Sequence, residues 1–180
     1  MSATLIKLLL TDHEETRALM AGFDDLPKER REEAFWALVA TLVKHEVAVE
    51  EVLYPAVRKY VDGGDDLAGK RLDEQSEAER LLVRMERELK TEVAFMQNFA
   101  NLRDAVLEHA EAEEQTVFPE LASVLDQNKL VELGERYELA KASAPTHPHP
   151  HIPDSPPGDV FVGAVAALVD KVRDAVRKAS

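Results

Sequence analysis

The chain has 180 residues, of which 45% are hydrophobic, a composition that supports one domain with a sizeable core. Its formal net charge of −13 argues against binding to nucleic acid or to anionic membrane surfaces, because both need basic patches. Cysteine is absent, which excludes disulfides and thiolate sites, so any metal must bind nitrogen and oxygen ligands. No stretch reaches the ~20 apolar residues of a membrane span, and we expect a soluble, cytoplasmic protein.

Apolar residues recur at helical spacing almost throughout, without sustained strand-like alternation, and this pattern predicts an all-α protein. The first helix is expected from about residue 3 to residue 22. The second is expected from about residue 29 to residue 61, with a kink or a break at Pro55. After the turn at residues 62–65, two more helices are expected, separated near Thr91, a candidate helix cap. The connections are short, so these helices are predicted to form an antiparallel four-helix bundle with additional C-terminal helices.

The sequence changes character after the predicted bundle domain of residues 1–125. Residues 126–180 are expected to form a C-terminal extension that packs on the bundle and begins with a short helix at about residues 130–140. The stretch 144–158 is rich in proline and histidine and cannot be helical, so it is predicted to be an extended strap. A last amphipathic helix is expected over about residues 159–177, and its apolar face must be buried on the bundle or on a partner.

A sequence repeat links the second and fourth predicted helices. His45 and His109 are each followed by a glutamate at the fifth position, an aromatic residue at the ninth and a proline at the tenth. The two helices are therefore predicted to play equivalent roles about a pseudo-twofold axis. Each histidine is in line with the apolar stripe of its helix, which predicts that both imidazoles point inward.

An inward-facing histidine needs a polar partner. On the fourth helix Glu113 supplies one, because it follows His109 by four residues and shares the same face. A buried carboxylate is costly unless it is paired or binds a cation, and a metal ion would satisfy both groups. His13 is on the inner stripe of the first helix and Glu74 on that of the third. Any one of these residues is more simply a hydrogen-bonded core group, but their conjunction on four helices predicts a metal centre in the core.

Three motifs resemble those of the hemerythrin-like proteins, also called HHE cation-binding domains: Asp12-His13-Glu14, His45 with its following Glu-Glu-x-Leu-Tyr-Pro, and His109-x-Glu-x-Glu-Glu with Phe118-Pro119. The resemblance covers roughly residues 3–125, and the later strap resembles the tail of an actinobacterial branch. It implies a four-helix bundle with an oxo- or hydroxo-bridged di-iron centre. Relatives use such centres to bind oxygen, to sense oxygen, nitric oxide or iron, and for peroxide-related chemistry. Carried over residue by residue, the resemblance implies the metal ligands His13, His45, His109 and Glu113.

Two positions depart from the family pattern. Val49 stands where the second motif of the family has a carboxylate, and valine cannot bind metal. Glu46 and Glu50 are the available substitutes: Glu46 flanks the inner stripe more closely, whereas alignment with the second repeat favours Glu50. Gln75 stands where many relatives carry a histidine on the third helix, so the adjacent Glu74 is the candidate ligand from that helix.

These observations favour a di-iron protein that binds or reacts with a small diatomic molecule or peroxide. No separate acid, base or nucleophile is evident, so peroxide- or nitric-oxide-related turnover would have to use the metal. The alternatives are a non-catalytic iron-binding or gas- and redox-sensing protein, with a protein partner or a second copy on the C-terminal helix, and a structural bundle that has lost its metal through Val49. The strap histidines have a spacing that fixes no closed metal site, and a polar strap is their simpler interpretation: His147, His149 and His151.

Overall fold

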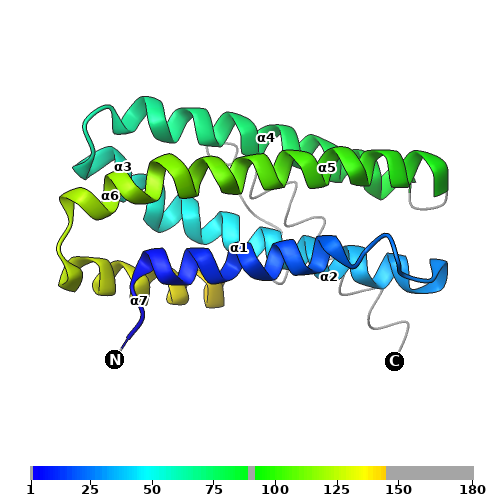
Figure 1. The fold of residues 1–180 in the computed structure, drawn as a ribbon, viewed down its shortest axis with the longest axis horizontal. Helices are drawn as coiled ribbons and strands as arrows, with labels where there is room; N and C mark the ends of the chain where they lie inside the picture. The colour runs from blue at the N-terminus through cyan, green and yellow to red at the C-terminus, as the bar shows by residue number, and fades with distance from the viewer. Residues whose placement is uncertain (1, 89–91, 145–180) are drawn as a thin grey trace, which may run out of the picture.

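The computed structural model describes residues 2–88 and 92–144, and these residues form helices and no strand. The four long helices are α1 (Leu5–Ala21), α2 (Lys28–Ala48), α4 (Gly64–Glu88) and α5 (Glu92–Ala112). They run alternately in opposite directions, with α4 beside α5 and α1 beside α2 (Figure 1). The prediction of an all-α antiparallel bundle is confirmed.

Two π-helical segments occur at equivalent places in the sequence repeat. They are η1 (Val49–Leu53), which joins α2 to α3 (Tyr54–Tyr60), and η2 (Glu113–Val117), which joins α5 to α6 (Phe118–Val124). The backbone N–H of Tyr54 donates to the carbonyl of Val49, and that of Phe118 donates to the carbonyl of Glu113. The proline after each aromatic residue has no N–H, and its ring would clash with a carbonyl in a regular turn. The wider turn accommodates this proline, so the expected kink or break at Pro55 takes the form of a π-helical turn.

The core consists of two hydrophobic clusters with a band of polar residues between them. Along α1, His13 comes between Leu9 of one cluster and Met20 of the other. The cluster around Met20 is rich in aromatic rings, such as Phe23 and Phe99, whose centroids are 3.8 Å apart. Burying such a side chain stabilises the fold by about 1.5–3 kcal/mol, so the clusters hold the polar band in place from both sides.

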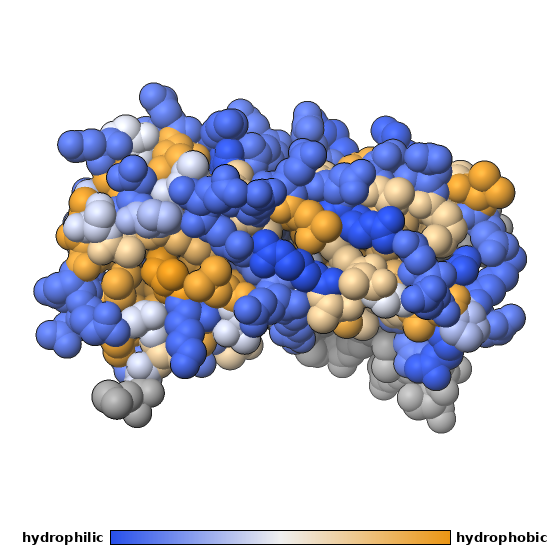
Figure 2. All heavy atoms as spheres, in the orientation of Figure 1, coloured by the Kyte–Doolittle hydropathy of each residue, from blue (hydrophilic) through white to orange (hydrophobic). Residues whose placement is uncertain are grey.

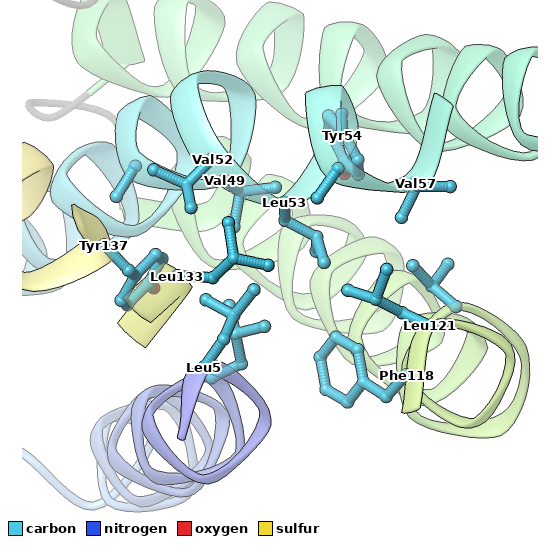
Figure 3. Packing of buried hydrophobic residues seen from close by; sticks show 14 of the residues in the cluster. Leu5, Val49, Val52, Leu53, Tyr54, Val57, Phe118, Leu121, Leu133 and Tyr137 are labelled. Atoms are coloured by element: carbon cyan, nitrogen blue, oxygen red, sulfur yellow. The ribbon is translucent and has the colours of Figure 1, made fainter. Parts of the chain in front are cut away.

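A further helix, α7 (Gln127–Ser143), packs against α1, α2 and η1. The helix expected at about residues 130–140 is therefore present, over a longer range. It approaches α1 closely because residue 134 is glycine: a Cβ there would come within 2.5 Å of the carbonyl oxygen of Ala3. From α7, Leu133 and Tyr137 reach into the second cluster, where they meet Leu5 of α1 and Val49 of η1 (Figure 3).

Charged and polar side chains cover most of the face in Figure 2, with apolar atoms gathered mainly toward the end that carries α3, α6 and α7. Among the residues that the structure describes, no helix is long and apolar enough to cross a membrane. The predicted cap Thr91, the proline- and histidine-rich strap and the last amphipathic helix lie outside the described residues.

Candidate metal centre

Three histidines from three helices turn into the polar band. His13 of α1, His45 of α2 and His109 of α5 are all buried, with exposed fractions of 4%, 5% and 8%. Each ring has its Nδ1 atom engaged on the outer side of the band. Nε2 of His13 and Nε2 of His109 are buried and have no hydrogen-bond partner within the described part of the chain. The predicted inward orientation of the rings therefore leaves two ring nitrogens without a hydrogen bond from any described residue.

Glu113 is the central carboxylate of this group and is fully buried. Its Oε2 atom lies 3.3 Å from Nε2 of His13, and its Oε1 atom lies 3.8 Å from Nε2 of His109. Tyr54 donates its hydroxyl hydrogen to Oε1 over 3.0 Å, so the aromatic residue that follows η1 supports the carboxylate of the other repeat. His13, His45 and Glu113 each offer a ligand atom within 4.8 Å of the others, a group compact enough to hold one metal ion.

The first repeat contributes both of its candidate carboxylates to the same region. Glu46 has a buried Oε2 atom without a hydrogen-bond partner among the described residues. Burial raises the pKa of Glu46 well above its ordinary range, and the nearby charges of Glu113 and Glu50 raise it further. Glu50 accepts a hydrogen bond of 2.6 Å from the side-chain amide of Gln75, which is itself buried. Carboxylates that repel one another in a buried site are stabilised by a cation.

Glu74 occupies a different place from the other predicted ligands. Its Oε2 atom accepts from Nδ1 of His109 over 3.2 Å, and its Oε1 atom accepts from Arg71 over 2.8 Å. Glu74 therefore holds Nδ1 of His109. Like His109 itself, Glu74 is outside the compact group of His13, His45 and Glu113. On α4 the more buried side chain is that of the neighbouring Gln75, with an exposed fraction of 4%.

The polar partners of His45 come from α1 and α7 and were not predicted. Tyr137 lies 2.9 Å from Nδ1 of His45 and donates its hydroxyl hydrogen to Asp12 over 2.6 Å. Lys141 donates to both carboxylate oxygens of Asp12. Burial alone would raise the pKa of Asp12, but the nearby His45 and hydrogen bonds from Lys141 and Tyr137 outweigh it and hold that pKa well below its usual range. The available signal was the position of Tyr137 on the apolar stripe of α7, between Leu133 and Ala140.

The electrostatics differ between the histidines. For His13, burial opposes the charged form, but the nearby carboxylates of Glu113 and Glu114 outweigh it and raise the pKa. Glu114 accepts from Nδ1 of His13 over 2.7 Å and also pairs with Arg17 over 2.8 Å. Burial lowers the pKa of His45, which keeps this imidazole neutral near pH 7. A neutral imidazole is the form that binds a metal.

A small cavity of about 20 Å³ adjoins the histidines and Glu46, with apolar walls that include Leu42 and Val106. This volume suits a molecule of roughly the size of one water. Arg17 and Leu107 line both this cavity and a larger surface cleft of about 580 Å³. These two residues therefore lie where the cleft and the cavity adjoin.

The residues present fit a metal that binds imidazole and carboxylate. Seven buried atoms lack hydrogen-bond partners among the described residues, and four of them are imidazole nitrogens or carboxylate oxygens, which bind iron, zinc and related ions. The other three belong to Arg71 and Gln75. A model of the hemerythrin HHE cation-binding domain family matches residues 4–121. The chain belongs to this family. The family assignment predicted from the sequence motifs is therefore confirmed, and α7 of this hemerythrin-like chain follows the matched segment.

Two curated proteins illustrate the range of relatives. The chain is 30% identical over 138 residues to an uncharacterized hemerythrin-like protein of Schizosaccharomyces pombe, and this match covers 76% of the chain and 68% of the relative. It is 29% identical over 132 residues to a DNA nickase of Nostoc, which covers 73% of the chain but 37% of that protein. Because so little of the nickase is matched, its named activity is not carried over to this hemerythrin-like chain. No solved structure matches.

Proposed function

We propose that this chain holds a non-haem di-iron centre and binds or reacts with a small molecule such as dioxygen, nitric oxide or peroxide. The observation that carries the proposal is a set of buried nitrogen and oxygen atoms that have no hydrogen-bond partner among the described residues, on His13, His109, Glu46 and Glu113. A buried polar atom left unsatisfied costs about 1–3 kcal/mol, so several in one place indicate that something other than the polypeptide completes them. Membership of a cation-binding family supports a metal ion in this role.

The size of the donor set supports a pair of ions. Three imidazoles and the carboxylates of Glu46, Glu50 and Glu113 face the same band between the clusters. These side chains outnumber the four ligands that a single tetrahedral metal ion needs. Carboxylate-rich sets of this kind, projected from the helices of a bundle, hold metal pairs.

The residues around the donor atoms have separate tasks in this proposal. When bound, iron supplies redox and Lewis-acid chemistry. The carboxylates of Glu46 and Glu113 offset the charge of the cations, and the partners of each Nδ1 atom orient the rings. Leu42 and Val106 limit the water that reaches the site, and the small cavity restricts the bound molecule to a few heavy atoms. Arg17 and Leu107 control access from the surface cleft.

The first test is the metal content of the protein. After expression in iron-rich medium, elemental analysis is expected to give about two irons per chain, with near-ultraviolet absorption from the ferric form. Glu113→Gln removes a charged metal ligand at nearly constant side-chain volume and is expected to abolish most of the iron binding. Glu111→Gln is the matched control, because Glu111 is an exposed glutamate at the end of α5, two residues before Glu113. Iron near zero in the unaltered protein would contradict the proposal.

A non-catalytic iron-binding or sensing role is the second candidate. It is favoured by the contact between His45 and Tyr137, because α7 could transmit a change at the centre to the segment that follows it. Steady-state assays of the iron-loaded protein with peroxide separate the two roles. Turnover supports the enzyme, whereas stable iron without turnover supports the sensor.

A further inference from the structure

Helix α7 follows the segment that matches the family, yet it supplies two of the polar groups behind His45. Those groups are the hydroxyl of Tyr137 and the ammonium of Lys141, and both contact Asp12 of α1. Tyr137 is fully buried and part of the second hydrophobic cluster, where Figure 3 shows its ring between α7 and η1. The position of its hydroxyl group is thus fixed by packing.

The donors and acceptors around Asp12 can be arranged in one direction only. Lys141 donates to both oxygens of Asp12, over 2.6 and 2.7 Å, which pairs the carboxylate with a cation. Tyr137 donates its one hydroxyl hydrogen to Asp12 over 2.6 Å. The 2.9 Å contact between the Tyr137 hydroxyl and Nδ1 of His45 must then have the nitrogen as donor. The hydrogen bonds run from His45 to Tyr137 to Asp12.

This direction decides which nitrogen of His45 is free. A neutral imidazole carries one ring hydrogen, and a hydrogen on Nδ1 leaves the lone pair of Nε2 available. Asp12 alone would not serve the same purpose, because its nearest oxygen is 3.5 Å from Nδ1 of His45. The Tyr137 hydroxyl bridges this gap. By contrast, His13 and His109 donate directly to the carboxylates of Glu114 and Glu74.

We propose that Tyr137, Asp12 and Lys141 form a relay that holds the hydrogen of His45 on Nδ1 and so keeps Nε2 free to bind metal. Tyr137 is a positioning residue in this relay, and α7 is a component of the metal centre. The consequence for metal binding rests on the proposed function. The position of the hydrogen on His45 does not, because it follows from the hydrogen bonds alone.

The variant Asp12→Asn tests the relay because it keeps the size of the side chain and changes one acceptor into a donor. The amide oxygen remains the acceptor for Lys141, so the amide nitrogen faces Tyr137 and donates to its oxygen. The hydroxyl hydrogen then turns to Nδ1 of His45, and the ring hydrogen moves to Nε2. An equivalent exchange in a catalytic triad also produces the wrong tautomer.

The primary measurement is nitrogen-15 NMR of the full chain, labelled at histidine and freed of metal by chelation, with His45→Gln to assign the signals. In the unaltered protein Nε2 of His45 is expected to lack a hydrogen, and in Asp12→Asn it is expected to carry one. Circular dichroism checks the fold of each sample. A hydrogen on Nε2 of His45 in the unaltered protein would overturn the relay. Because this result comes from the NMR spectrum of the unaltered protein, it tests the relay even if Asp12→Asn does not fold.

The secondary measurement is competition for iron against a chelator. Asp12→Asn and Tyr137→Phe are expected to weaken iron binding by about 10–100-fold, as for other partners of ligating histidines. Tyr60→Phe is the matched control, because Tyr60 lies in α3 and has no part in the relay. An unchanged affinity in Asp12→Asn, with its tautomer also unchanged, would overturn the proposal. If the tautomer changes as expected but no form of the protein binds iron, the relay stands and the proposed function fails.

Discussion

The two repeats around His45 and His109 have the same backbone conformation but place their buried carboxylates at different positions. Each continues into a π-helical turn and then into a short α-helix that begins with an aromatic residue and proline. The second repeat carries its buried carboxylate four residues after the histidine, at Glu113. The first repeat has Val49 at that position and instead buries a carboxylate oxygen directly after the histidine, at Glu46. The repeated backbone thus fixes where the histidine rings point. The position of the carboxylate differs between the two halves of the site, the first around His45 and the second around His109.

The halves also differ in what holds the outer nitrogen of the histidine. His109 donates directly to Glu74, which is on the neighbouring helix α4. His45 reaches Asp12 only through Tyr137 of α7. The first half therefore depends on a helix outside the bundle, and the second does not.

Moving the carboxylate within the first repeat is expected to have the largest effect. Glu46→Ala should weaken iron binding more than about tenfold, because a charged donor is lost. Adding Val49→Glu places a carboxylate at the position equivalent to Glu113 and should recover part of the lost affinity, measured by chelator competition. A double variant that binds iron no better than Glu46→Ala would show that the two backbones are not equivalent.

Displacing α7 is expected to affect only the first half. Gly134→Ala puts a methyl group against the backbone of residues 3–5, and such overpacking costs about 1–3 kcal/mol. Thermal unfolding measures the loss of stability. In histidine NMR spectra the signals of His45 should shift more than those of His109. Equal shifts at both histidines would argue that α7 supports the whole centre.

The charge of Glu46 should make the metal-free protein sensitive to pH. The pKa of this carboxyl is raised in the folded state, so its contribution to stability is fully present below its ordinary value of 4.5 and is lost as pH rises through the raised value. Glu46→Gln should therefore stabilise the metal-free protein near pH 7 by on the order of 1 kcal/mol. The same variant should weaken iron binding. Denaturant unfolding from pH 4 to pH 8 gives the pH dependence of the free energy of unfolding for the unaltered protein and for Glu46→Gln. If Glu46→Gln is less stable than the unaltered protein near pH 7, the destabilising role given to the Glu46 charge is wrong.

The prolines after the two π-helical turns are expected to have the smallest effect. Both Pro55 and Pro119 are exposed, so replacing either by alanine should change the free energy of unfolding by less than about 1 kcal/mol. Iron release to a chelator should be faster in Pro119→Ala, because the turn before Pro119 carries Glu113. Faster release from Pro55→Ala instead would reverse the roles given to the two halves.

The sequence was sufficient to predict the features that depend on helical periodicity. The apolar stripes predicted the bundle and the inward rings, and the spacing of His109 and Glu113 predicted one shared face. Periodicity could not decide between Glu74 and Gln75, because neighbouring positions flank the same stripe. Nor could it predict that Tyr54 donates to Glu113, since that bond joins different helices across the widened turn.

The contribution of α7 to the site could not be predicted from the sequence, for a similar reason. Tyr137 and Asp12 are far apart in the sequence, and no spacing rule brings them together. Their contact depends on the close approach at Gly134 and on the burial of the tyrosine ring in the second cluster. A tyrosine on an apolar stripe predicts burial, but it does not predict which polar group its hydroxyl will meet.

The central claim is that the buried imidazole nitrogens and carboxylate oxygens without hydrogen-bond partners among the described residues are metal ligands. Crystals of the iron-loaded protein, measured at the iron absorption edge, test it most directly. We expect anomalous peaks in the band between the hydrophobic clusters, in contact with Nε2 of His13 and His109 and with carboxylate oxygens of Glu46 and Glu113. Iron bound elsewhere, or no peak in this band, would contradict it.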